Sequence, residues 1–191
     1  MPTSPNPLPA NKFFEQSKPL PFEDMNNSAL ARLPNQTTNK KNLGDTYLKF
    51  QFGQQTPAVL PMSRAQEVVI VPVHRLTPMP NMPAYVMGLL NRRSKVLWLI
   101  DLARMLGLPP VEINVQHYNI VIISNGSATF GLIVQAVEGV VRLTPESIQS
   151  PLGQVSSGLV PYLRGCVLQE QEILLVLDAE AIMNSPLLHS A

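Results

Sequence analysis

The chain has 191 residues, of which 45% are hydrophobic, and a formal net charge of +1. This size predicts one domain of ordinary length with a sizeable core plus a tail, and the near-zero charge argues against nucleic acid as a partner. No apolar segment approaches the ~20 residues that a transmembrane helix needs, so we expect no direct insertion into the membrane. The first residues lack a signal-peptide pattern and Cys166 is the single cysteine, which together favour a reducing, cytoplasmic location.

The first 44 residues differ in composition from the rest of the chain. They contain seven of the nineteen prolines, many Asn, Ser and Thr residues, and no sustained hydrophobic period. Such a segment has too little apolar surface to bury. We therefore expect a disordered Pro-rich tail over residues 1–44 and a folded domain over residues 45–185.

Short strands are predicted in the first part of this domain. Residues 46–52 alternate between polar and apolar side chains, which is typical of a half-buried strand. Residues 57–61 and 68–73 are short apolar runs, and prolines at both ends of the first run place it at a sheet edge or at strand ends. Three prolines within residues 78–83 then predict an extended linker, because proline fixes φ and disfavours helix in the preceding residue.

One stretch of the sequence occurs twice. Residues 162–183 align without a gap with residues 85–106, at a spacing of 77 positions. Each copy has a glycine, a short apolar run, a polar break, five consecutive apolar residues, an aspartate and a helical period. The apolar runs 96–100 and 173–177 are too short for helices and predict strands buried on both faces. The identical positions are Tyr85 and Tyr162, Gly88 and Gly165, Leu97 and Leu174, and Asp101 and Asp178.

The two repeated aspartates have a structural and a catalytic interpretation. Asp101 and Asp178 each stand between an apolar strand and a short helical pattern, where a carboxylate can accept hydrogen bonds from the free amides of the first helical turn. This position favours helix capping over catalysis.

The second half of the domain repeats the order of the first. Residues 120–124 and 130–134 are apolar runs joined by Asn125-Gly126, a strong hairpin signal. Residues 137–143 predict the next strand, and a short helix and a loop lead to the second copy. About ten short strands without long helices predict an all-β fold of two similar small barrels. The halves span roughly residues 45–112 and 117–185, and strands can exchange between them.

No catalytic, cofactor or metal site is predicted. His74, His117 and His189 are far apart in the sequence, and none has a second ligand at metal-binding spacing on its own element. A glycine-rich phosphate loop and a nucleophile elbow are absent from the sequence. Trp98 and Cys166 lie in apolar runs, where core packing is the simpler interpretation.

One charged segment interrupts the first repeat. Residues 91–94 are Asn-Arg-Arg-Ser, whereas the matching segment of the second copy has no cation. A solvated hairpin turn explains this pattern. A protein-recognition site is the alternative explanation, because the fixed geometry of arginine suits interfaces.

Several motifs resemble the CheW family of chemotaxis coupling proteins, in order and in spacing. The family pattern has Pro-Asn-x-Pro-x-aromatic-apolar-x-Gly, then Asn-Leu-Arg-Gly, then an apolar strand ending in Asp-Leu. The matching residues are 66–68 (QEV), 80–88 (PNMPAYVMG), 91–102 (NRRSKVLWLIDL), 130–134 (FGLIV), 143–148 (LTPESI) and 162–165 (YLRG).

The resemblance implies a fold of two five-stranded, SH3-like β-barrels with a few short helices. It implies a non-catalytic adaptor without cofactors, which couples the regulatory domain of a CheA-like histidine kinase to the cytoplasmic tip of a methyl-accepting receptor and is recruited to the inner face of the membrane through receptor arrays. By motif, receptor contacts fall on Ala65, Glu67, Arg93 and Ile120, with Arg92 beside them. Kinase contacts fall on Gly88 and Val137.

The sequence departs from the family pattern at three informative positions. Arg92 replaces the leucine of Asn-Leu-Arg-Gly, and Ser94 replaces its glycine, which argues against a positive φ at that turn. Trp98 replaces a proline. Trp98 and the Pro-rich tail are similar to cyanobacterial phototaxis and pilus-motility members. A role in a pilus or gene-regulation pathway outside taxis stays open as the alternative.

Overall fold

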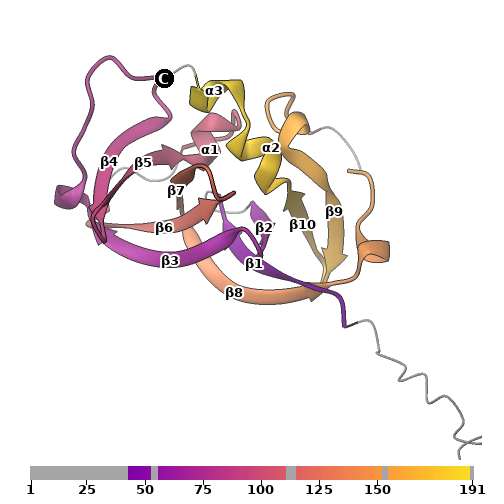
Figure 1. The fold of residues 1–191 in the computed structure, drawn as a ribbon. Coiled ribbons are helices and arrows are strands. Elements are labelled where there is room, and N and C mark those ends of the chain that lie inside the picture. The colour runs from indigo at the N-terminus through magenta and orange to yellow at the C-terminus, as the bar shows by residue number, and fades with distance from the viewer. Residues whose placement is uncertain (1–42, 53–55, 111–114, 152–154, 190–191) are drawn as a thin grey trace, which may run out of the picture. The chain divides into compact units, whose positions relative to one another are not determined.

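The computed structural model describes residues 43–52, 56–110, 115–151 and 155–189. The predicted disorder of the tail lies outside these residues, apart from Leu43 and Gly44. These described residues form ten strands and three short α-helices (Figure 1). Their bounds are β1 Asp45–Gln51, β2 Pro57–Pro61, β3 Ala65–Pro72, β4 Val86–Arg92, β5 Lys95–Asp101, α1 Leu102–Met105, β6 His117–Ser124, β7 Thr129–Val134, β8 Ala136–Leu143, β9 Leu163–Gln169, β10 Glu172–Leu177, α2 Ala179–Met183 and α3 Pro186–His189.

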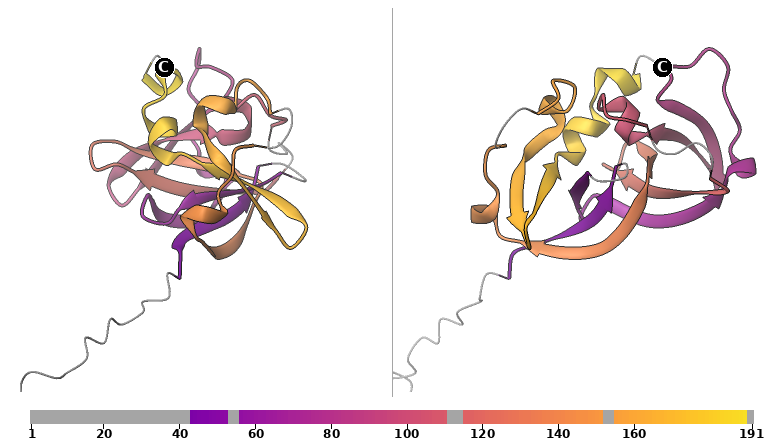
Figure 2. Two further views of the ribbon diagram at one scale, coloured as in Figure 1. Left: turned by 90° about the vertical axis from the view of Figure 1, so that its right-hand side faces the viewer. Right: turned by 180° about the vertical axis from the view of Figure 1, so that it is seen from behind.

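The strands form two five-stranded sheets, which confirms the predicted all-β class. The first barrel has the order β3-β6-β7-β5-β4, and the second barrel has the order β8-β1-β2-β10-β9. Each barrel therefore combines three consecutive strands of one sequence half with a hairpin of the other half. Each exchanged hairpin makes one parallel strand pair with the barrel that it joins. These pairs are β7 with β5 and β2 with β10. The short helices gather where the two barrels meet (Figures 1 and 2).

Each barrel is closed by a short bridge that explains the repeated glycine. Thr77 and Leu89 exchange backbone hydrogen bonds of 2.9 and 2.8 Å in the first barrel. In the second barrel, the same closure joins Gln149 to Cys166. A Cβ at Gly88 would lie 2.3 Å from the carbonyl oxygen of Thr77, and a Cβ at Gly165 would lie 2.5 Å from that of Gln149. Only glycine lets the closing backbone approach this closely.

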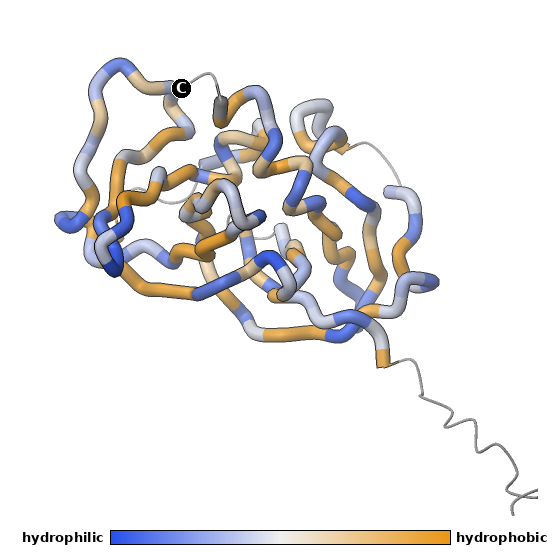
Figure 3. Tube along the Cα trace, viewed as in Figure 1, coloured by the Kyte–Doolittle hydropathy of each residue, from blue (hydrophilic) through white to orange (hydrophobic). Residues whose placement is uncertain are grey.

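Among the residues that the structure describes, three apolar clusters make up the core. One fills the first barrel, one fills the second, and the largest lies between the barrels. Tyr47 belongs to the interior of the second barrel, whereas its neighbours Leu48 and Phe50 belong to the cluster between the barrels. Strand β1 is thus buried on both faces over these residues, so the predicted polar face is wrong at Tyr47. The colouring in Figure 3 shows apolar stretches along the strands and hydrophilic stretches at turns.

The repeated aspartates cap the helices that follow them, as predicted. The carboxylate of Asp101 accepts a hydrogen bond from the amide of Arg104 at 3.0 Å. The carboxylate of Asp178 accepts from the amides of Glu180 and Ala181 at 2.9 and 3.1 Å. These bonds satisfy amides of the first helical turn that have no partner within the helix.

Burial of the repeated strands is less complete than predicted. Val96 is 63% exposed and Ile173 is 50% exposed, although both belong to the apolar runs expected to be buried on both faces. Each is the second residue of its strand, next to the hairpin turn. Among the described residues, no helix is both long and apolar enough to cross a membrane.

Candidate functional site

The end of the first barrel brings one carboxylate together with three cations that lie about 25 positions later in the sequence. We call this surface the arginine end and define it by Glu67, Arg92, Arg93 and Lys95. Glu67 accepts hydrogen bonds from Nε of Arg92 at 3.2 Å and from a terminal nitrogen of the same guanidinium. A terminal nitrogen of Arg93 lies 3.4 Å from Glu67. The structure therefore brings together three of the predicted receptor-contact residues.

The strand pattern explains why these charges meet. Glu67 lies on the same face of β3 as buried Val69, and Arg92 lies on the same face of β4 as buried Leu90. Both side chains therefore extend beyond the end of the barrel core and pair there. The side chains of Arg92 and Glu67 are 31% and 28% exposed, whereas that of Arg93 is 78% exposed.

The ion pair changes the acidity of the carboxylate. The hydrogen bond from Arg92, together with the charges of both arginines, lowers the pKa of Glu67 below its ordinary value and outweighs the opposing effect of burial. Glu67 is consequently an anion throughout the neutral range. With three cations and one anion, the arginine end carries a surplus of positive charge.

The turn between β4 and β5 corrects one expectation about Ser94. Arg93 and Ser94 have φ values of +47° and +63°, as in a two-residue hairpin turn of type I′. The absence of glycine therefore does not prevent a positive φ here, because the closed barrel holds both strands in register. The matching turn of the second repeat has the same geometry, with Glu170 and Gln171 at +48° and +73°.

Two other predicted receptor contacts differ in accessibility. Ala65 begins β3 and is half-buried, so part of it faces solvent. Ile120 is fully buried in the interior of the first barrel, opposite Val69 in β3. A direct contact by the side chain of Ile120 does not fit this structure, since the residue fills the core and presents no surface to a partner.

The two predicted kinase contacts lie in different barrels. Gly88 is buried beside the bridge that closes the first barrel. Val137 is the second residue of β8 in the second barrel, is half-buried and packs against the cluster between the barrels. Gly88 can therefore act only through the shape of the backbone, whereas Val137 presents part of its side chain.

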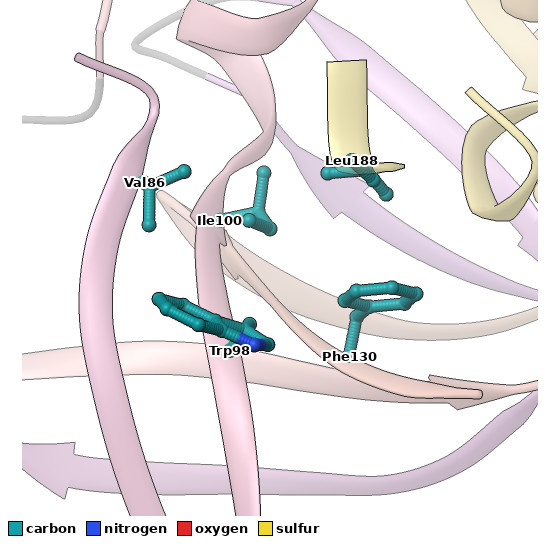
Figure 4. A pocket seen from close by; sticks show the side chains of 5 residues that line it. All are labelled: Val86, Trp98, Ile100, Phe130 and Leu188. Carbon is teal, nitrogen blue, oxygen red and sulfur yellow. The ribbon is translucent and has the colours of Figure 1, made fainter. Parts of the chain in front are cut away.

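Sequence reasoning missed a small cavity beside the cluster between the barrels. Its volume is about 30 Å³, and five hydrophobic residues line it, one of which, Trp98, carries a polar indole nitrogen (Figure 4). β4, β5 and β7 supply four of them, and α3 supplies the fifth. They are Val86, Trp98, Ile100, Phe130 and Leu188. The signal for this site was the replacement of proline by Trp98, which was interpreted only as core packing.

A second depression brings two histidines together. His74 and His117 both line it, with Pro72, Val73 and Gln116. Metal coordination in proteins requires further ligands, and the described part of the chain contains no group of three or more His, Cys, Asp or Glu residues able to hold an ion.

Comparisons with known proteins agree with the fold and with the motifs. A family model described as a CheW-like domain matches residues 46–187. The probable chemotaxis protein CheW of Rhizobium etli is 33% identical over 145 residues, which cover 75% of this chain and 90% of that protein. The protein PilI of Pseudomonas aeruginosa is 27% identical over 113 residues, which cover 59% and 62% of the two chains.

A solved structure shows the same fold. The scaffolding protein TtCheW of Thermoanaerobacter tengcongensis superposes with a TM-score of 0.61 at 21% identity, over 71% of this chain and 89% of the other. Proteins of this kind are non-catalytic scaffolds. On the family match and the identity to curated relatives, this chain belongs to the CheW family.

Proposed function

We propose that this chain couples a CheA-like histidine kinase to the cytoplasmic tip of a methyl-accepting chemoreceptor or photoreceptor. Membership of the CheW family supports an adaptor role. Two separate surfaces on one rigid body make the second contact effectively intramolecular, so a stable assembly does not require either contact to be tight. Binding to the receptor would recruit the chain to the inner face of the membrane.

The arginine end is the proposed receptor surface. The observation that carries this assignment is the contrast between its two arginines. Arg92 is committed to Glu67 through two hydrogen bonds, whereas Arg93 reaches Glu67 only at 3.4 Å and leaves 78% of its side chain exposed. A partner carboxylate can therefore pair with Arg93 without breaking the bonds of Arg92. The fitting partner is a receptor helix that carries acidic residues.

Charge reversal tests this assignment. Arg93→Glu should weaken pull-down of a receptor-tip fragment by about tenfold or more, because a repulsive contact replaces an attractive one at the interface. Arg142→Glu is the matched control, since Arg142 is also exposed but lies on β8 of the second barrel. Both variants should keep the thermal midpoint of the parent. Equal receptor binding by Arg93→Glu and the parent would refute the assignment.

We propose a kinase surface at Val137, while Gly88, which is buried in the other barrel, acts through the shape of the backbone. Val137 supports it because it is half-buried at the start of β8 and offers an apolar side chain to a partner. Val137→Ala should reduce binding of the kinase regulatory domain while receptor pull-down is unchanged. If Val137→Ala weakened both kinase binding and receptor binding, the change would indicate a general structural defect instead of a separate kinase contact.

A second candidate is an adaptor in a pilus or gene-regulation pathway. The similarity to PilI is the observation that favours it. Co-purification from cells separates the two functions. Recovery of a CheA-like kinase together with a methyl-accepting receptor supports taxis, whereas recovery of the kinase with pilus components and without such a receptor supports the alternative.

A further inference from the structure

The C-terminal segment crosses from one barrel to the other. It follows α2, which continues from β10 of the second barrel, and it ends with Leu188 on the cavity of the first barrel. We call residues 185–188 the strap. Leu188 is 9% exposed and belongs to the cluster between the barrels, while its neighbour Leu187 is 38% exposed.

The two repeated tyrosines hold the strap. The hydroxyl of Tyr85 donates to the backbone carbonyl of Leu187 at 2.7 Å. The hydroxyl of Tyr162 lies 2.6 Å from Oγ of Ser185, in a buried hydrogen bond. The two tyrosines make equivalent backbone contacts. The carbonyl of Tyr85 accepts from the backbone amide of Asp101, and the carbonyl of Tyr162 accepts from the backbone amide of Asp178, both at 2.8 Å. Equivalent residues from both halves therefore hold one unique segment.

Leu188 lines the small cavity together with four residues of the first barrel. Trp98 and Phe130 are register partners on β5 and β7, and Val86 and Ile100 are register partners on β4 and β5 (Figure 4). These four residues form an apolar surface on the outer face of the first barrel, and the short α3 places a leucine against it. The surface thus already accommodates one leucine presented by a helical turn.

We propose that the strap is an autoinhibitory cover, which a partner helix displaces by inserting its own apolar side chain in place of Leu188. The outer face of β5 continues from Trp98 past exposed Val96 towards the arginine end. Trp98 and Lys95 are three residues apart, or about 10 Å along a strand. A helix rises 1.5 Å per residue, so the same distance corresponds to about seven helical residues.

The fitting partner is therefore an amphipathic helix with a leucine-like residue and, about two helical turns away, acidic residues that face Arg93 and Lys95. The strap is suited to displacement, because α3 has only four residues and is too short to be stable by itself. The hydroxyl bonds of Tyr85 and Tyr162 and the burial of Leu188 hold it in place. The identification of this helix with a receptor helix rests on the proposed function; the displacement itself does not.

Trp98 provides a direct measurement, since it is the single tryptophan of the chain and lines the cavity. The test uses the full chain and a synthetic amphipathic peptide with one leucine and two glutamates spaced two helical turns away. Leu188→Ser should increase quenching of Trp98 by acrylamide and tighten peptide binding. If the open state is populated at 1–10%, the gain in affinity is about tenfold to hundredfold.

Two variants and one peptide control the experiment. Tyr85→Phe keeps the ring, removes the bond to Leu187, and should give a smaller gain in the same direction. Leu187→Ser changes the neighbouring exposed leucine and should leave affinity unchanged. A peptide with serine in place of its leucine should show no gain with any variant.

Equal peptide affinity for Leu188→Ser and the parent, in folded protein with more accessible Trp98, would overturn the inference. An equal gain in Leu187→Ser would also overturn it. These outcomes are separate from the proposed function. If a receptor tip binds the parent and Leu188→Ser equally, only the proposal that the strap covers the receptor site is refuted. If neither receptor nor kinase binds the parent or any variant, but Leu188→Ser still binds the peptide more tightly, only the proposed partners are refuted.

Discussion

The two barrels share one strand order, but their ends carry opposite ionic arrangements. At the arginine end, the carboxylate of Glu67 lies between Arg92 and Arg93. At the matching end of the second barrel, the ammonium group of Lys49 lies 2.9 Å from Glu138 and 2.8 Å from Glu172. We call this second group the lysine end.

The repeated sequence shows the same reversal of charge. At the spacing of 77 residues, Lys95 corresponds to Glu172 and Arg92 corresponds to Gln169. Partly exposed ion pairs contribute little to stability, so the fold tolerates either sign at these positions. The comparison indicates that barrel closure and the interior clusters determine the fold, while the charge at each end is available for selecting partners.

Alanine at the two closing glycines tests the shared part of the comparison and has the largest expected effect. Gly88→Ala should lower the free energy of unfolding by about 3 kcal/mol, because the added Cβ meets the Thr77 carbonyl and φ is positive. Gly165→Ala should cost about 2 kcal/mol, because the clash occurs without a positive φ. The measurement is the urea midpoint at constant m value.

Gly126→Ala is the control for these glycines. Gly126 also has a positive φ, of +93°, but an added Cβ would meet no atom within 4 Å. Its expected cost is about 1 kcal/mol, from the backbone alone. A loss as large as that of Gly88→Ala would show that φ, and not the closing bridge, is responsible.

One matched pair of facing residues differs in side-chain size between the two barrel interiors. Leu99 pairs with Gly131 in the first barrel, whereas Val176 pairs with Val59 in the second. A Cβ at Gly131 would lie 2.4 Å from Cδ2 of Leu99. Gly131→Val should therefore cost about 2 kcal/mol through overpacking. Combining it with Leu99→Val should cost less than the sum of the single changes, as measured by a double-mutant cycle; strict additivity would contradict this packing.

The lysine end should respond to alkali more than the arginine end. Hydrogen bonds to Glu172 and Glu138 raise the pKa of Lys49 above its ordinary value of 10.5. The stabilisation from charged Lys49 is thus complete below about pH 10.5 and is lost as pH rises through the raised value. Lys49→Met should cost about 1 kcal/mol at neutral pH and should remove this alkaline loss.

The matched change at the arginine end is Arg92→Met. The pKa of Glu67 is lowered, so its stabilising contribution is present above its ordinary pKa of 4.5 and is lost as pH falls through the lowered value. Arginine stays charged in alkali. Arg92→Met should therefore leave the alkaline part of the stability profile unchanged; an effect there equal to that of Lys49→Met would contradict the inversion.

The smallest expected effects are at the two equivalent turns. Ser94→Gly and Gln171→Gly should each stabilise the chain by about 0.5 kcal/mol. Glycine removes the steric cost of a positive φ in the folded state, but it also makes the unfolded chain more flexible, which offsets part of the gain. Thermal midpoints measure the change. Ser94→Ala keeps the strained backbone and should give no gain, so a gain equal to that of Ser94→Gly would exclude strain as its origin.

Local patterns predicted much of this fold. The repeat, the short strands, the Asn125-Gly126 hairpin and the caps at Asp101 and Asp178 follow from periodicity and turn chemistry within a few residues. The arginine segment was also visible, because its charge interrupts an apolar repeat. The structure agrees with a hairpin turn at residues 93–94, and the recognition site stays a proposal that the exposure of Arg93 allows.

By itself, the sequence determined a duplicated all-β domain with capped short helices, because those features depend on neighbouring residues. Only the tertiary structure decided that hairpins exchange between barrels, that Tyr47 and Ile120 are interior, and that Glu67 meets Arg92. It also decided that Leu188 and Trp98 line the same cavity. These contacts join residues that are 25 positions apart, as for Glu67 and Arg92, to 117 positions apart, as for Val59 and Val176. No local period reports such contacts, and only the closing of the sheets brings the side chains together.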